Sequence, residues 1–264
     1  MSSMIRSLRA GLLGGALLLG LAATAAQAHS PYLLPSVFDA SDRTLVTVEG
    51  AFTESFFTPE VVMKSDAYAV IGPDGVRTPL TPTYLRQLAI AEVVTEKPGT
   101  YRITTGQRAG RVAKAALVDG DWKFFEGGKA PADAIDMQSI TTADVYVTRG
   151  APSDAALAPT GKGLEFRPIT HPSKIVTGQP AVFEALFDGK ALPGLRVTLS
   201  AADDRYADAK APPQTFTTDA KGLVAIKVER SGVYQVQARH RVASAGPGQP
   251  GQSHTYALTF ESLR

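Results

Sequence analysis

Short segments in which apolar and polar residues alternate follow one another along the chain from His29 onward. Such alternation, with a period of two residues, is typical of a β-strand that buries one face. In the first half of the chain the clearest examples are residues 44–49, 68–71, 100–104 and 144–148. Turns such as Pro73-Asp74-Gly75 and Pro98-Gly99 separate them. The pattern predicts a β domain over residues 29–150, in which only residues 82–92 allow a turn or two of helix.

A stretch without periodicity separates this first unit from a second one. Residues 151–163 are rich in small and helix-breaking residues, which is typical of a connector between domains. Beyond it, short strand candidates recur at residues 164–169, 181–187, 195–200, 214–217, 223–228, 233–240 and 254–261. Strands of this number and length predict an immunoglobulin-like or transthyretin-like β-sandwich over residues 164–264. The expected fold class is therefore all-β, with two β-sandwich-like domains.

Residues 1–28 have the three parts of a leader that directs export. Arg6 and Arg9 are followed by an apolar run over residues 10–23, and Ala26-Gln27-Ala28 forms a small-x-small cleavage site. The alternative is a membrane anchor, but a spanning helix needs about 20 consecutive apolar residues, and this run is shorter. No later segment is apolar enough to span. We therefore expect a cleaved signal peptide at residues 1–28 and a soluble mature chain outside the cytoplasm.

Composition and charge exclude several classes of protein. The chain is 44% hydrophobic, so it can bury a core, and disorder is excluded. It has 27 Lys and Arg against 25 Asp and Glu, and removal of the two leader arginines leaves 25 against 25. A neutral mature chain is a poor partner for nucleic acid, whose binding needs many cations. Because the sequence has no cysteine, disulfides and thiolate metal ligands are excluded as well.

Export would give His29 an unusual position. Cleavage after Ala28 makes it the first residue of the mature protein, so an α-amine and a ring nitrogen on the same residue can close a chelate ring on one metal ion. Nickel, cobalt, copper and zinc all accept nitrogen donors of this kind. Such a chelate usually needs further ligands, and the sequence contains three other histidines.

Two of these histidines lie at the inner ends of the last two predicted strands. His240 and His254 flank the loop of residues 242–252. If the strands form an antiparallel hairpin, the two residues fall nearly opposite each other, with Cβ atoms about 5 Å apart. That spacing suits two imidazoles on one ion, whereas a register slip of one residue would separate them. His171, in Thr170-His171-Pro172, could approach the same end only if the topology allows it.

The other motifs do not indicate a catalytic site. The sequence contains no Walker A, G-x-S-x-G or H-E-x-x-H motif. Residues 246–251 match G-x-G-x-x-G, but two prolines and a following strand make the segment a loop. The adjacent carboxylates Asp203-Asp204 lie on a polar loop and are interpreted as solvated. We therefore do not expect an enzyme.

Several segments carry a resemblance to a known group of proteins. Ala28-His29-Ser30-Pro31-Tyr32-Leu33-Leu34-Pro35 resembles the start shared by a large group of uncharacterised bacterial periplasmic proteins. These are often labelled periplasmic components of cobalt or nickel uptake systems. Matching stretches include Gly72–Gly75, Pro98–Ile103, Thr170–Pro172, Phe187–Gly194, Thr218–Gly222 and Gly232–Tyr234. The resemblance implies a periplasmic, all-β protein with an immunoglobulin-like second half and a transition-metal role.

Three functions follow from these observations. The first is a periplasmic protein that binds nickel, cobalt or copper and delivers the ion to a membrane transporter or an outer-membrane receptor. Its candidate ligands are His29, His240, His254 and His171. The second is an envelope interaction or glycan-binding module without metal. The third, ranked last, is a copper oxygenase built on His29 and one partner histidine, because nothing in the sequence specifies a substrate surface for it.

Overall fold

The computed structural model describes residues 29–55, 57–118, 121–125, 130–206 and 213–264. The predicted leader, residues 1–28, lies outside them. The described chain consists almost wholly of strands, with short 3₁₀ turns η1 (Ala155–Leu157), η2 (Pro172–Lys174) and η3 (Ala202–Tyr206). This confirms the all-β fold class. No helix within the described ranges is long and apolar enough to cross a membrane.

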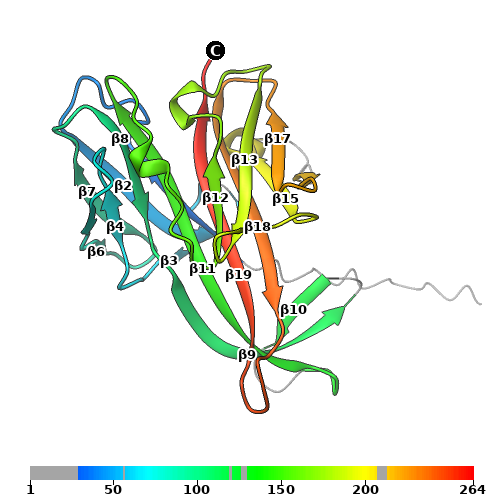
Figure 1. Ribbon diagram of the computed structural model, residues 1–264. Helices are drawn as coiled ribbons and strands as arrows, with labels where there is room; N and C mark the ends of the chain where they lie inside the picture. The colour runs from blue at the N-terminus through cyan, green and yellow to red at the C-terminus, as the bar shows by residue number, and fades with distance from the viewer. Residues whose placement is uncertain (1–28, 56, 119–120, 126–129, 207–212) are drawn as a thin grey trace, which may run out of the picture.

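The strands form three sheets (Figure 1). The N-terminal sheet contains β1 (Ser30–Pro35), β2 (Leu45–Thr53), β3 (Val61–Val62), β6 (Thr83–Tyr84) and β7 (Ala89–Val94). The C-terminal sheet contains β12 (Leu164–Pro168), β13 (Pro180–Phe187), β14 (Lys190–Ala191) and β17 (Leu223–Lys227). The central sheet contains β4 (Ala69–Ile71), β5 (Arg77–Pro79), β8 (Gly99–Thr104), β9 (Arg108–Val118), β10 (Asp121–Phe125), β11 (Ile135–Arg149), β15 (Arg196–Ala201), β16 (Gln214–Thr217), β18 (Gly232–Val242) and β19 (Gly251–Ser262).

The central sheet is covered on opposite faces by the other two sheets. On β11, Val145 and Val147 are buried in the core beneath the N-terminal sheet, whereas Tyr146 is buried in the core beneath the C-terminal sheet. Successive side chains of a strand point to opposite faces, so the two cores lie on the two sides of β11. Each half of the chain therefore forms a β-sandwich, and the two sandwiches share one sheet.

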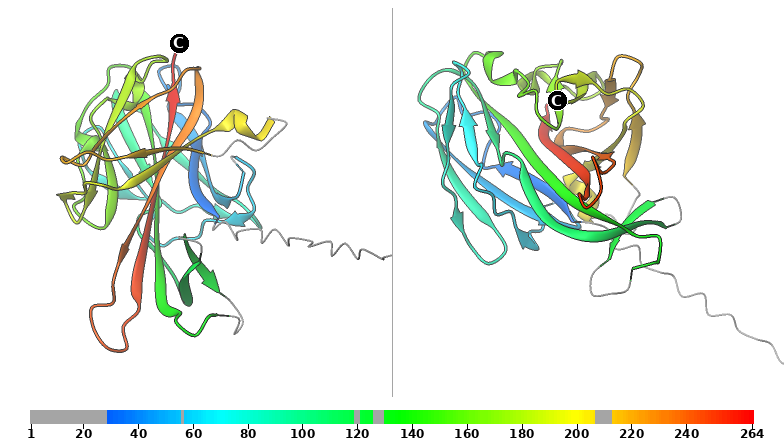
Figure 2. Two further views of the ribbon diagram at one scale, coloured as in Figure 1. Left: turned by 90° about the vertical axis from the view of Figure 1, so that its right-hand side faces the viewer. Right: turned by 60° about the horizontal axis from the view of Figure 1, so that its bottom comes forward.

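A parallel pairing joins the halves. β11 belongs to the first half and β19 to the second, and they pair in parallel from Met137–Gly251 to Val145–Thr259. The two strands run side by side through the middle of the molecule (Figures 1 and 2). On the face of the N-terminal sheet, Gln235 of β18 donates to the carbonyl of Pro31 at 2.9 Å. The shared sheet thus places the start of β1 beside strands from the second half.

A buried ionic network lies where the halves meet. Arg102 of β8 is bonded to Asp144 of β11 at 2.6 and 2.7 Å, and Tyr256 of β19 donates to the same carboxylate at 2.5 Å. Arg102 also donates to the carbonyl of Ala158, within the predicted connector. Glu165 accepts the backbone N–H groups of residues 160 and 161 at 2.8 Å each. The connector is therefore anchored to both halves, and its role as a domain boundary stays a prediction.

Two parts of the sequence form strands where none was expected. Residues 82–92, the one candidate for helix, instead contribute β6 and the start of β7, which pair with each other at Thr83–Ile90 and Tyr84–Ala89. This prediction was wrong because pairing with β2 determines the conformation of β7. The long strand β9 was also not predicted. With β10 it extends from one end of the molecule, beside the β18–β19 hairpin (Figure 1).

Candidate functional site

His29 lies at the start of β1, where the strand pairing places it beside acidic residues. β1 pairs with β2 in antiparallel register, and the last pair is Ser30 with Thr53. The next position along this register puts His29 beside Glu54, at the end of β2. β3 returns along β2 immediately after Glu60, whose backbone N–H donates to the carbonyl of Phe52 at 3.1 Å. Three elements of the N-terminal sheet thus converge on one point.

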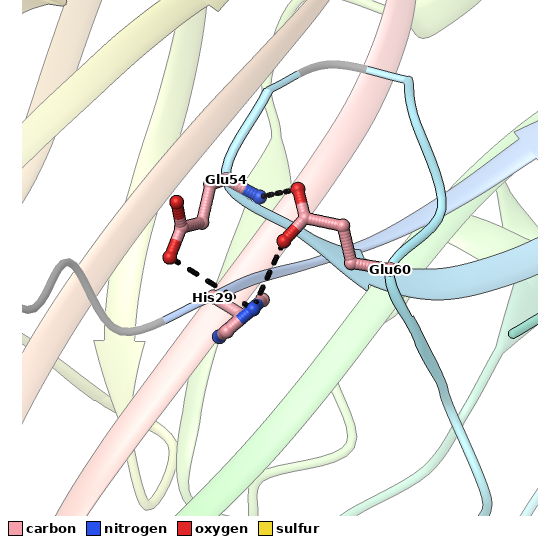
Figure 3. Close-up of side chains that lie close together, drawn as sticks. All are labelled: His29, Glu54 and Glu60. Atoms are coloured by element: carbon pink, nitrogen blue, oxygen red, sulfur yellow. Dashed lines mark hydrogen bonds and ion pairs between the residues drawn. The ribbon is translucent and has the colours of Figure 1, made fainter.

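The side chains at this point form a mixed nitrogen and oxygen cluster (Figure 3). His29 Nε2 is 3.0 Å from Glu60 Oε2 and 3.9 Å from Glu54 Oε1. The ligand atoms of the three residues all lie within 4.8 Å of one another. We refer to His29, Glu54 and Glu60 as the His29 cluster. Among the described residues, it is the one group of three or more such side chains that could hold a metal ion.

The cluster is accessible, and part of it is held in place. The side chains of His29, Glu54 and Glu60 are 39%, 47% and 33% exposed, so an ion or a partner can reach them. Glu60 Oε1 accepts the backbone N–H of Glu54 at 2.9 Å, which fixes its carboxylate across the loop and turns Oε2 toward His29 (Figure 3). One carboxylate is therefore oriented before any ion arrives.

His29 is among the residues that line a cleft of about 710 Å³ over the central sheet. Its walls come from both halves of the chain and include Arg108 of β9 and Arg239 of β18. Ser253 and Thr255 of β19 also line it. These residues are on the face that the N-terminal sheet covers, because they alternate with Tyr256 and Leu258, which belong to the other core. His29 thus connects the cluster to a cleft that both halves of the chain line.

His240 and His254 are brought together, as the predicted hairpin required. They form a directly opposed pair in the β18–β19 register. The ring of Phe187 packs against both, with centroids 4.6 Å from His240 and 5.0 Å from His254. His254 Nε2 is 3.0 Å from Gln252 Oε1, and its buried Nδ1 has no hydrogen-bond partner among the described residues. Burial lowers the pKa of both imidazoles, and Asp188 partly opposes this.

This pair lies on the other side of the sheet from His29. Phe187 belongs to β13 of the C-terminal sheet, so the two histidines face that sheet, whereas Arg239, Ser253 and Thr255 face the cleft. The alternation of side chains along β18 and β19 separates the two sets. The structure therefore does not bring His240 and His254 to the ion position beside His29.

His171 is at a third place and both its nitrogens make hydrogen bonds. Its Nδ1 accepts the backbone N–H of Ser173 at 3.2 Å and caps η2. Its Nε2 is 3.0 Å from Thr100 Oγ1 and 3.4 Å from the carbonyl of Ser153. Burial lowers the pKa of His171, and the hydrogen bond to Ser153 opposes this. These contacts link the start of the second half to β8, which is a structural role.

The partners of His29 were missed in the sequence. Glu54 and Glu60 flank a short loop after an alternating strand, which is a common place for solvated acids. Only the pairing of β1 with β2 makes them neighbours of His29, and that register is not visible in the local pattern. The local sequence around Glu54 and Glu60 gives no signal that marks them as partners of His29.

Comparison with known proteins finds one matching family and several solved structures of low similarity. None of the curated proteins matches the chain. Among solved structures, the adhesin InvE of Yersinia pseudotuberculosis is 13% identical with a TM-score of 0.21, and the match covers 88% of this chain and 58% of that one. The adhesin FdeC of Escherichia coli is 15% identical with a TM-score of 0.22, covering 89% and 63%. The FN1–FN3 domains of chicken CNTN1 are 9% identical with a TM-score of 0.24, covering 89% and 100%.

At TM-scores of 0.21 to 0.24, these likenesses carry no argument about this chain, which spans little more than half the length of the first adhesin. The family match is more extensive. A model described as a domain of unknown function, DUF4198, matches residues 26–242. The matched range begins just before His29 and includes Glu54, Glu60 and all but the last strand of the central sheet. The chain therefore belongs to the DUF4198 family.

Proposed function

We propose that this protein binds a divalent transition-metal ion through His29, Glu54 and Glu60. The observation that carries the proposal is the convergence of one imidazole and two carboxylates beside a cleft that His29 lines. Bonds of about 2.0 to 2.2 Å from a metal to nitrogen or oxygen place two ligand atoms roughly 3 to 3.5 Å apart. The 3.0 Å between His29 and Glu60 fits that spacing, and the exposed Glu54 at 3.9 Å needs a small movement.

The donor set narrows the choice of ion. One nitrogen and two carboxylate oxygens suit nickel, cobalt, zinc and copper in the divalent state. Which of them binds depends on the geometry of the site and on the availability of each metal. Thioether donors are not part of the set, so copper in the monovalent state is disfavoured. The proposal replaces the predicted histidine partners by carboxylates and keeps His29 as the central ligand.

Removal of residues 1–28 would add a further donor. The α-amine and Nδ1 of one histidine can bind the same ion, whereas Nε2 points away from the backbone. In the structure Nε2 faces the carboxylates (Figure 3). A site that uses the amine therefore requires the imidazole to turn over about its Cβ–Cγ bond. A form with one extra residue before His29 isolates this contribution, since it keeps the ring and loses the terminal chelate.

The wider role that we propose is periplasmic capture of the ion and its delivery to a membrane transporter or an outer-membrane receptor. The leader-like pattern of residues 1–28 and the resemblance of the junction at His29 to the cobalt and nickel group support it. The exposure of all three ligands supports it further, because a partner can reach a surface site and take over the ion.

Titration of the chain that begins at His29 with nickel, cobalt, copper and zinc ions tests the proposal. Replacing Glu60 by Gln keeps the shape and removes the charge, and we expect the affinity to fall at least about tenfold. Glu92→Gln, at an exposed position of β7, is the matched control and should bind as the unaltered chain does. Equal affinities of the two variants, or no binding by the unaltered chain, would refute the site.

A second candidate function is supported by the apolar face of the β9–β10 arm. Leu117 and Ile135 are 57% and 44% exposed, and the strand register places them on the same face as Trp122 and Phe124. Exposed apolar surface of this kind marks protein contact sites. This surface favours the envelope-interaction module. If that module is the function, titration with metal ions should show no binding, and Leu117→Glu should abolish the complex with the partner protein.

A further inference from the structure

The cleft that His29 lines has positively charged walls. Arg108, Arg111 and Arg239 line it, and no aspartate or glutamate stands among the described residues that do so. Hydroxyl groups supply most of the other polar lining, at Ser139, Thr141, Ser253 and Thr255. Guanidinium groups bind carboxylates and phosphates through charge-assisted hydrogen bonds, and hydroxyls add neutral ones. The lining therefore suits a small anion.

Two of the arginines are held in position by the protein. Arg239 Nε donates to Thr255 Oγ1 at 3.1 Å. Arg108 Nε donates to the carbonyl of Lys64 at 2.9 Å, and its guanidinium carbon lies 5.4 Å from the centre of the Phe52 ring. These contacts reduce the side-chain freedom that a ligand would otherwise have to restrict. The cleft thus presents oriented cations from two halves of the chain.

Ser253 points independently to a ligand. Its side chain is only 1% exposed although it lines the cleft. Its Oγ has no hydrogen-bond partner among the described residues. A buried hydroxyl without a partner costs stability, and such groups are rare unless something else satisfies them. A polar ligand atom in the cleft would provide the missing hydrogen bond.

We propose that the cleft binds a small anion with two or more carboxylates, and that the metal ion arrives at His29 as a chelate of that anion. The second part rests on the proposed function, whereas the first does not. Glu54 and Glu60 beside His29 suit a cation, and the arginines that line the cleft suit carboxylates. A metal chelate contains both a cation and carboxylates, so it matches both sets of residues. The volume of about 710 Å³ admits a small molecule, and Phe52 and Phe125 offer apolar walls to its carbon skeleton.

Calorimetry with citrate on the metal-free chain tests the cleft alone. We expect citrate to bind, with an affinity that weakens as salt increases, because the contacts are between charges. Arg239→Gln should lower the affinity at least about tenfold, since it removes charge-assisted hydrogen bonds. Arg196→Gln, at an exposed position of β15 outside the cleft, is the matched control and should bind citrate normally. Absence of citrate binding, or equal affinities of the two variants, overturns the proposal.

Two further arms test the class of anion and the contribution of Ser253. Inorganic phosphate is the comparison ligand, and binding of phosphate in place of citrate would contradict a polycarboxylate site. Ser253→Ala removes the buried hydroxyl, and we expect weaker citrate binding together with an unchanged or higher melting temperature. A lower melting temperature with unchanged citrate binding would show that Ser253 has only a structural role and would remove this support for the site.

A preformed nickel–citrate complex tests the link to the metal. We expect it to bind at least about tenfold more tightly than citrate alone, because the His29 cluster and the arginines of the cleft both contribute. Glu60→Gln should remove this gain, because it takes away a charged ligand of the ion. If citrate binds and nickel does not, the metal function fails and the anion site stands. If nickel binds and citrate does not, the anion site fails and the metal function stands.

Discussion

At the residue scale, the charge of Arg102 is buried between the two halves of the molecule. Its side chain is 4% exposed, and that of Asp144 is fully buried. Replacing Arg102 by Met leaves the carboxylates of Asp144 and Glu165 buried without their cation. We expect a loss of about 3 to 5 kcal/mol in the free energy of unfolding. Urea unfolding followed by circular dichroism measures it.

A second variant separates charge from packing at this position. Arg102→Met combined with Asp144→Leu removes the stranded carboxylate as well, so it should be more stable than Arg102→Met alone. A loss below about 1 kcal/mol in the single variant would show that the network contributes little.

The His29 cluster, in contrast, is exposed and should contribute little to stability without metal. We expect Glu60→Gln to change the unfolding free energy of the metal-free protein by no more than about 0.5 kcal/mol, as for other surface ion pairs. Nickel at 100 times its dissociation constant should stabilise the unaltered chain by about 2.7 kcal/mol. Thermal unfolding with and without nickel checks both values. A full nickel effect in Glu60→Gln would mean that the ion binds elsewhere.

Single residues show how far the sequence could predict the site. His29 was identified because its position after a cleavage motif is visible in the sequence. Its partners Glu54 and Glu60 were not identified, because their proximity depends on the register of β1 with β2 and on the return of β3. The local sequence can therefore identify a single candidate ligand, but it cannot predict that three strands bring its partners to the same place.

At the scale of elements, the β18–β19 hairpin contains a buried histidine, His254, directly opposite a partly buried one, His240. Burial lowers the pKa of His240 and His254 below the ordinary value of 6.5, while each keeps that value in the unfolded chain. Between the lowered pKa and 6.5, the unfolded state therefore binds more protons than the folded state. Stability should fall as the pH decreases through this window and should be unaffected by these groups above it.

Urea unfolding at pH 7.5 and pH 5.5 tests this dependence. Replacement of both histidines by Gln should make the fall in stability smaller. His171 acts in the same direction, since burial lowers its pKa as well, so part of the fall should remain. An unchanged pH dependence in the double variant would show that the pair is not a source of acid sensitivity.

The elements themselves were largely predictable. Most strands of the second half lie within two or three residues of their expected positions, because alternation and turn residues coincide there, as at β16 and β17. β9 was missed, because its run from Arg108 to Val118 contains small and charged residues with little alternation. Its pairing with β10 and β11 stabilises the extended conformation, for which its own residues have little preference.

At the scale of the whole molecule, the shared central sheet should make unfolding cooperative. Separation of the halves would break the β11–β19 pairing and expose the Arg102 network. We expect a single unfolding transition, with far-ultraviolet and near-ultraviolet circular dichroism coinciding. Two resolved transitions would indicate that each sandwich is stable alone.

The sequence does not predict that the two sandwiches share their central sheet. Two β units separated by a glycine- and proline-rich connector predict two separate sandwiches, and each unit does have its own core. The parallel contact joins strands that are more than 100 residues apart, and no local pattern specifies it. The same contact creates the cleft, since its walls come from β9 and from β18 and β19.

The central claim is that one imidazole and two carboxylates hold the ion. X-ray absorption of the nickel-loaded chain that begins at His29 tests it most directly, because scattering from imidazole rings can be counted. We predict a single imidazole per nickel, with the remaining ligands being oxygen or amine nitrogen, and no imidazole in His29→Ala. Two imidazoles per nickel that persist in His29→Ala would place the ion at His240 and His254 and contradict the account.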